Sequence, residues 1–240
     1  MNSNPDISLV NSLTGHVTLF GPLIIITIGT LGCLCNFITF TSVKLRKNSC
    51  SFYFLSAAVF DLFTLDFGAL TRLLADHFGL TFYHQSSIFC KLRQYLVNTL
   101  PALATLCIVL ATLDRYMSTS DKLSCRSLAT VHSAKRIASI SSIICVLSYI
   151  HYPIFSDLRP TCSVMTGTYG LFAVVYSITW TSVLPHFLMI CFGMGMHRHI
   201  RLARRRVTPA SHPLRRFQRK ELQLISVSQH SVLIVPTFFP

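Results

Sequence analysis

The chain has 240 residues, of which 51% are hydrophobic and only 12% are charged, and its mean hydropathy is +0.54. Soluble domains usually carry about 25% charged residues, so this composition excludes a water-soluble globular domain and predicts a membrane protein. The formal net charge of +13 would also suit a nucleic-acid partner, and only the positions of the basic residues can separate the two explanations.

Long stretches without charged residues predict membrane-spanning helices, because about 20 apolar residues cross the core of a bilayer as a helix. Five spans are expected, at residues 19–43, 51–74, 90–116, 136–155 and 169–196, although Asp61, Asp66 and Arg72 interrupt the second. Residues 222–240 are uncharged but contain several Ser and Gln residues, so they predict only a partial sixth span. The expected fold is all-α, a multi-pass transmembrane helical bundle (19–196) with five clear spans plus a partial sixth.

The segment before the first span, residues 1–18, is polar and contains no Lys or Arg. A cleaved signal peptide begins with a basic region and has a shorter apolar run than the one found here. The first span is therefore expected to stay in the membrane as an anchor, with residues 1–18 as its flanking terminal segment.

The 21 Lys and Arg residues are concentrated on one side of the predicted membrane. Seventeen of them lie in or next to the segments between spans one and two, between spans three and four, and in the basic loop 197–221. The positive-inside rule places these three segments in the cytoplasm and the N-terminus outside the cell. Topology thus accounts for the basicity without nucleic acid, and the Arg-rich loop is expected to attract anionic membrane lipid.

Three amide or carboxyl side chains lie inside the first two spans. Asn36 is an amide in an otherwise apolar stretch, and Asp61 and Asp66 interrupt the second span. A carboxylate in hydrocarbon is costly, so it usually faces the bundle interior and has a function. The alternative for Asp61 is a purely structural one, in which it is neutralised or hydrogen-bonded between helices. Asp66 is expected to face the outer cavity.

The third span places a cysteine and a basic residue at opposite sides of the membrane. Cys90 precedes Arg115 by 25 residues, which corresponds to about 37 Å of helix, enough to connect both interfaces. Cys90 then shares the oxidising exterior with Cys162 of the second outer loop, so a disulfide between them is chemically permitted. The alternative is two unpaired thiols among nine cysteines, and the bridge is favoured because the other seven lie in helices or inner loops.

Asp114, Arg115 and Tyr116 end the third span at its cytoplasmic edge. By themselves they could form an interfacial salt bridge with an arginine that extends toward water. Together with Cys90 at the outer end, however, the span resembles the third helix of rhodopsin-like (class A) G-protein-coupled receptors. The resemblance implies that Asp114 holds Arg115 in the inactive state, and that Arg115 turns toward a heterotrimeric G protein on activation.

The same resemblance assigns roles to residues on other spans. It places Asn36 and Asp61 in the family's interior polar network, where Asp61 is the main carboxylate of a sodium pocket. Ala104 replaces a serine that many members have near that sodium, so neither a metal nor any cofactor is assigned. Pro185 matches the mid-helix proline of the fifth helix, where a missing backbone N–H bends the helix. Glu221 resembles the acidic residue of the sixth helix that pairs with the triplet arginine.

The outer half of the third span suggests the class of ligand. Val97 stands where amine receptors have an aspartate for the ligand's ammonium group, so the resemblance implies a peptide or another non-amine ligand. The candidate ligand pocket is formed by residues near the outer ends of the second and third spans. These residues are Asp66, Gln94, Val97, Asn98 and Pro101, with Arg93 as a further polar contact.

The resemblance covers about residues 21–221 and departs from the family at several positions. The fourth span has no tryptophan, Gly193 replaces a tyrosine, and the characteristic motifs of the sixth and seventh helices are missing before Pro240. The resemblance therefore implies a plasma-membrane receptor that stops before its seventh helix. Such a chain is expected not to activate a G protein alone, and a non-signalling receptor fragment is one alternative.

Two other classes of protein, a small transporter or channel and a membrane enzyme, agree less well with the sequence. A small transporter or channel would use Asp61 and Asp66 along its pathway, but the repeated or broken helices typical of transporters are not evident in the sequence. An enzyme is not expected, because no nucleophile and base are separated in the sequence by a distance typical of a catalytic site. His197 and His199 are two residues apart and would point in different directions from a helix, so they do not suggest a shared metal.

Overall fold

The computed structural model describes residues 5–42, 45, 48–78, 86–120, 130–157, 162–164 and 167–206. The first half contains α1 (Pro5–Thr41), α2 (Ser49–Thr64), the π-helix η1 (Leu65–Leu70), α3 (Thr71–Phe78) and α5 (Ser87–Thr119). The second half contains α7 (Val131–Ser148), α8 (His151–Ile154), β1 (Ser156–Asp157), β2 (Ser163–Val164), α9 (Thr168–Ser177), the π-helix η2 (Ile178–Val183) and α10 (Leu184–Arg206). The predicted partial sixth span and Glu221 lie outside the described residues.

Five helical segments are long and apolar enough to cross a membrane, which confirms the five predicted spans. They are Val17–Thr41, Ser49–Leu74, Ser87–Thr119, Val131–Ile154 and Thr168–Leu202. Large apolar side chains such as Ile28, Ile143 and Phe187 are exposed on them, as expected for surfaces that face hydrocarbon rather than water. The protein is a multi-pass membrane protein with an α-helical bundle.

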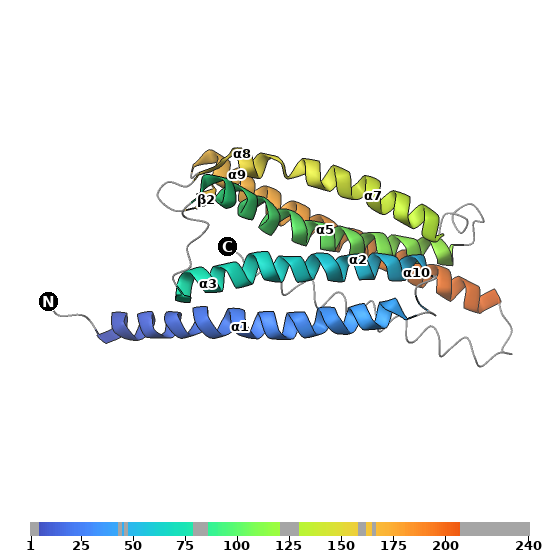
Figure 1. Cartoon of the computed structure of the whole chain (residues 1–240). Coiled ribbons are helices and arrows are strands. Elements are labelled where there is room, and N and C mark those ends of the chain that lie inside the picture. Colours follow the sequence, from blue (N-terminus) through green and yellow to red (C-terminus); the bar gives the residue numbers. More distant parts are fainter. Residues whose placement is uncertain are drawn as a thin grey trace.

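The centre of the bundle is α5, which is the most buried of the five spans, whereas α1 is the least buried. α2, α7 and α10 all pack against α5, and α2 lies between α1 and α5 (Figure 1). Small residues on α5, including Ala102, Ala104 and Ala111, are almost fully buried. Small side chains allow helix backbones to approach closely, which is how helices in membranes gain packing energy.

Two spans are interrupted by π-helical segments that the sequence did not predict. η1 joins α2 to α3, and η2 joins α9 to α10 immediately before Pro185. Proline cannot donate a backbone hydrogen bond, and the wider turn of η2 ends at Val183, shortly before Pro185; the helix bend at Pro185 stays a prediction. Such π-helical bulges re-aim the side chains of a helix and often occur at functional sites.

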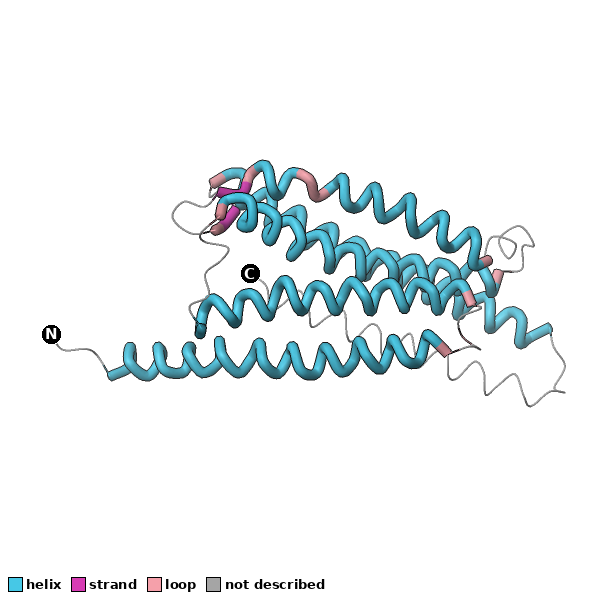
Figure 2. The backbone as a smooth tube through the Cα atoms, in the orientation of Figure 1, coloured by secondary structure: helices cyan, strands magenta, loops and turns pink. Residues whose placement is uncertain are grey.

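A short antiparallel ladder adds two strands to the expected all-α fold. Ser156 pairs with Val164, and Asp157 pairs with Ser163. Figure 2 shows these strands at the end of the bundle where α5 begins. The ladder directs the chain after α8 across the end of α5, so it positions Cys162 next to that helix.

Candidate functional site

The C-terminal end of α5 is joined to the start of α2 through Asp114. The side chain of Asp114 is only 5% exposed. The hydroxyl of Ser49 donates to both carboxylate oxygens, at 2.9 Å to Oδ1 and 2.8 Å to Oδ2. Hydrogen bonds to a carboxylate are short and strong, so Ser49 holds Asp114 in place as the first residue of α2.

Arg115 follows Asp114 in sequence and interacts with it electrostatically near the C-terminal end of α5. The backbone carbonyl of Arg115 accepts hydrogen bonds from the hydroxyls of Ser118, at 2.9 Å, and Thr119, at 3.1 Å. These bonds tighten the last turn of α5 before the helix ends at Thr119. The predicted pairing of Glu221 with Arg115 lies outside the described residues and stays a prediction.

Tyr116 lies near the C-terminal end of α5 and packs against α10. Its ring lies 5.9 Å from the ring of Phe192 and 5.5 Å from that of His199, measured between ring centroids. Gly195 lies between these two residues on α10, and a Cβ atom there would be 2.7 Å from Cε2 of Tyr116. Only glycine leaves room for this approach, so Gly195 is a structural partner of the triplet that sequence reasoning missed.

A second contact fixes α2 and α7 beside the triplet. The hydroxyl of Tyr53 donates to the backbone carbonyl of Ala134 at 3.2 Å. Cys50, Tyr53, Ala111 and Ala134 belong to one buried apolar cluster at this end of the bundle. The triplet is therefore held by three helices, α2, α7 and α10, around α5.

The structure does not join the two residues predicted for an interior polar network. Asn36 is exposed on α1, and Asp61 is partly buried on α2. No hydrogen bond involves either side chain within the described part of the chain. Their shared network stays a prediction. Groups of three or more His, Cys, Asp or Glu residues that could hold a metal are absent from the described residues.

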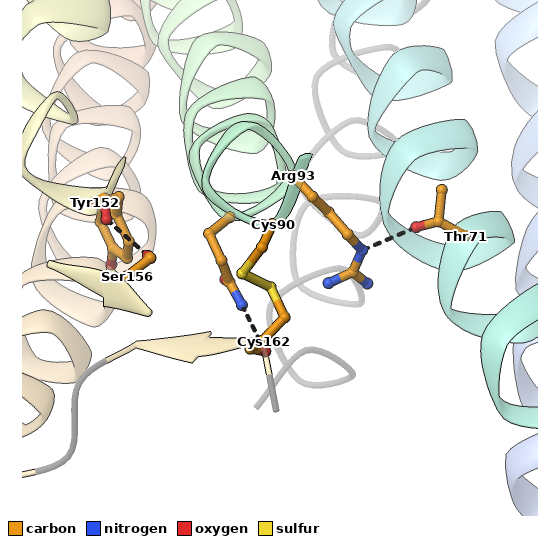
Figure 3. The surroundings of a disulfide bond; sticks show 7 residues. Thr71, Cys90, Arg93, Tyr152, Ser156 and Cys162 are labelled. Atoms are coloured by element: carbon orange, nitrogen blue, oxygen red, sulfur yellow. Dashed lines mark hydrogen bonds between the residues drawn. A yellow bond between two sulfur atoms is a disulfide. The ribbon is translucent and has the colours of Figure 1, made fainter. Parts of the chain in front are cut away.

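The predicted disulfide is present at the N-terminal end of α5. Cys90 and Cys162 are bonded, with their Cα atoms 5.6 Å apart and a sequence separation of 72. Cys90 is fully buried. The bridge ties the segment that contains β2 to the first turn of α5, and Figure 3 shows it between the surrounding helices.

Polar side chains surround this disulfide. Gln94 donates through Nε2 to the carbonyl oxygen of Cys162 at 3.4 Å, and Asn98 donates through Nδ2 to the carbonyl of Gln94 at 2.7 Å. Arg93 donates through Nε to the hydroxyl of Thr71 at 3.0 Å, which links α5 to α3 (Figure 3). Sequence reasoning missed Thr71, whose role depends on this contact between helices.

The other residues predicted for a ligand pocket are distributed along the same half of the bundle. Val97 and Pro101 are partly buried on α5, and Asp66 is exposed on η1. Gln94 and Asn98 are therefore the two predicted pocket residues that the structure joins directly by a hydrogen bond. A shared pocket for all five residues stays a prediction.

An aromatic cluster near the C-terminal end of α7 and the N-terminal end of α9 was not predicted from the sequence. Its rings belong to Tyr149, His151, Tyr152, Phe155, Tyr169, Phe172, Tyr176 and Trp180. The hydroxyls of Tyr152 and Tyr176 donate to the backbone of Ala173 and Ser148, at 3.2 Å and 3.3 Å. The spacing of aromatic residues three or four apart from 169 to 180 is the sequence signal that could have revealed it, because such residues share a helix face.

Comparison with known proteins adds no family assignment. Protein-family models give no match to this chain, and no curated protein matches it.

Proposed function

We propose that this chain is a G-protein-coupled receptor-like signalling protein of the plasma membrane, with its N-terminus outside the cell. The observation that carries the proposal is the arrangement along α5. Cys90 forms a disulfide at one end of this helix, and Asp114, Arg115 and Tyr116 lie at the other end, with Asp114 held by Ser49. A disulfide that fixes the outer side and a constrained charged triplet on the inner side suit transmission of a signal between the two.

The charge distribution supports the proposed orientation. In the described part of the chain, basic side chains at the triplet end include Arg115, Lys135, Arg136, Arg198 and Arg201. The positive-inside rule assigns that end to the cytoplasm, where a heterotrimeric G protein would be the partner. The disulfide then lies on the oxidising side, which agrees with the chemistry of cysteine.

The proposed mechanism is a two-state change at the inner end of α5. In the resting state Asp114 interacts with Arg115 and accepts the hydrogen bond of Ser49, while Tyr116 rests against α10. An extracellular ligand would favour a second state in which Arg115 contacts the G protein. A ligand can shift this equilibrium only as far as it prefers one state over the other. With Val97 in place of an acidic residue, the proposed ligand is a peptide or another non-amine.

The proposal is tested by the binding of purified, nucleotide-free G proteins from a panel to the chain in lipid nanodiscs, because the chain alone is not expected to activate them. We expect measurable binding of at least one G protein, and an affinity about tenfold or more lower for Arg115→Ala, equivalent to about 1.4 kcal/mol. Arg136→Ala is the matched control, because Arg136 is exposed on α7 at the same side of the bundle. Binding that is absent from the whole panel, or unchanged in Arg115→Ala, would favour a non-signalling fragment or a transporter.

A further inference from the structure

Asp66 is an exposed carboxylate inside a membrane span. It belongs to the π-helical segment η1, which is part of the span Ser49–Leu74. Its side chain is exposed, and within the described ranges no hydrogen bond or ion pair involves its carboxylate. Carboxylates in membrane spans almost always face the bundle interior, where they find a partner. Asp66 therefore differs from the usual intramembrane carboxylate, because the described part of the chain supplies it with no partner.

The packing of η1 determines the direction of Asp66. Thr64 and Gly68, each two residues away, are buried, and residues two apart lie on nearly opposite sides of a helix. Leu65 packs against α1, since its Cδ1 atom lies 2.8 Å from the place that a Cβ atom at Gly29 would occupy. Contacts on these sides restrict rotation of η1, so Asp66 is held on the outward side of the segment.

The neighbours of Asp66 on this outward side are large and apolar. Phe63 and Leu70 lie about one helical turn before and after it, and they are 47% and 38% exposed. We call Phe63, Asp66 and Leu70 the η1 face. Exposed apolar side chains on a membrane span suit contact with hydrocarbon. The η1 face thus places one carboxylate in the centre of an apolar surface.

The carboxylate of Asp66 cannot escape from this environment. About 12 Å of helix separate Asp66 from the end of the span at Leu74. Long Lys and Arg side chains can extend over part of such a distance toward water, whereas the side chain of aspartate is short. The amine groups of lipid headgroups lie beyond the same end of the span. A cationic partner for Asp66 must therefore itself be inside the membrane.

A second copy of this chain is poorly suited to supply that cation. In the described residues of this half of the bundle, the basic side chains are those of Arg72, Lys91 and Arg93. All three lie nearer the end of the bundle than Asp66, and Arg93 donates to Thr71 at 3.0 Å. A parallel copy would therefore present its basic residues above the carboxylate, and the matching cation belongs to a different protein.

We propose that the η1 face binds a transmembrane helix of another protein that carries a Lys or Arg at the depth of Asp66. Membrane helices associate without a hydrophobic driving force, and opposite charges attract strongly where the dielectric constant is low. Both charges leave water when their helices insert, so their pairing adds no comparable desolvation cost. The long basic side chain can reach the carboxylate between Phe63 and Leu70. This partner site is independent of the proposed signalling function.

The test uses the full chain in phosphatidylcholine vesicles at neutral pH, together with synthetic transmembrane peptides made of Leu and Ala. Energy transfer between labelled chain and labelled peptide measures binding. We expect a peptide with a single Lys at the depth of Asp66 to bind with a Kd about tenfold or more lower than the same peptide with Leu there. Asp66→Asn should remove this preference. Asp66→Glu is the matched control, because it keeps the negative charge and should retain most of the preference.

A photoreactive group placed one turn from the Lys of the peptide locates the contact. We expect cross-links to the η1 face and not to Ile143, which is 59% exposed on α7. The comparison of Lys and Leu peptides needs no variant of the chain, so it decides the proposal even if Asp66→Asn does not fold. Equal binding of the two peptides, or cross-links spread over all spans, would overturn the proposal. Energy transfer between two copies of the chain that Asp66→Asn abolishes would also overturn it, by assigning the η1 face to a second copy.

Discussion

Gly195→Ala should destabilise the protein, although alanine is normally the better residue in a helix. The added Cβ atom would lie 2.7 Å from Cε2 and 3.1 Å from Cδ2 of Tyr116, whereas carbon atoms pack favourably at about 3.5–4.0 Å. The ring edge must therefore move by about 1 Å, and such overpacking typically costs about 1–3 kcal/mol. The helix preference of alanine returns up to about 1 kcal/mol. We expect a net loss of about 1–2 kcal/mol.

Thermal unfolding of the purified protein in detergent measures this loss. For a chain of this size about 1 kcal/mol corresponds to about 2–4 °C, so the expected decrease in Tm is about 2–8 °C. Gly193→Ala is a matched control, because a Cβ atom at Gly193 would meet nothing within 4 Å on the same helix. It should leave Tm unchanged or raise it.

A double variant separates the clash from any other effect of the substitution. In a Tyr116→Ala background the ring is gone, so Gly195→Ala should become neutral or stabilising. Coupling between residues in contact is commonly about 0.5–3 kcal/mol. The reasoning is refuted if Gly195→Ala is as stable as Gly193→Ala, or if the loss persists in the Tyr116→Ala background.

Three further predictions concern the ends of the bundle. Ser49→Ala should lower the free energy of unfolding, measured in urea, by about 1–3 kcal/mol, because the buried Asp114 carboxylate loses the hydroxyl donor of Ser49. Ser49→Thr keeps a hydroxyl and should preserve most of that free energy. Cys90→Ser should lose the bridge to Cys162 and about 2–5 kcal/mol, and peptide mapping without reductant should show no cross-linked pair. Tyr53→Phe should cost about 0.5–1.5 kcal/mol in the same urea assay, and an unchanged value would exclude its bond to Ala134.

Hydrophobic stretches predicted the five spans well. The positions of charged residues, however, gave wrong boundaries for some of these spans. The fourth span was expected to begin at residue 136, whereas α7 begins at Val131. The predicted loop extends to Lys135, yet long basic side chains can extend from a helix toward water. The side chain of Thr130 also caps this helix by accepting from the backbone N–H of Ser133 at 3.3 Å. Local capping chemistry, rather than the last charge, sets this boundary.

Contacts between helices account for most of what the sequence did not predict. Ser49 and Asp114 are 65 residues apart, and neither residue alone identifies the other. Gly195 offered a weaker signal, because glycine inside a helix costs about 1 kcal/mol relative to alanine and so suggests a packing constraint. Its partner Tyr116 became evident only when α5 and α10 were placed together. The disulfide was predictable because compartment chemistry left few cysteines on the outer side.

The two contacts made by Asp114 and Tyr116 also determine where Arg115 points. Successive residues of an α-helix are about 100° apart around its axis. Asp114 faces α2 and Tyr116 faces α10, so Arg115 projects between these helices. Leu113, which packs in the cluster shared with α7, lies about 100° on the other side of Asp114. Arg115 therefore lies on a different face of α5 from Leu113.

This geometry makes Ser49 and Gly195 positioning residues for Arg115, because each fixes a neighbour of Arg115 in the triplet. If Arg115 contacts a G protein as proposed, Ser49→Ala and Gly195→Ala should each change the affinity for that G protein by changing the orientation of Arg115. Both effects should then disappear in an Arg115→Ala background, where no guanidinium remains to be oriented. Effects that persist there would instead reflect a general loss of stability, which the unfolding measurements quantify independently. The combined variants thus distinguish a role of Ser49 and Gly195 in orienting Arg115 from a role in stability alone.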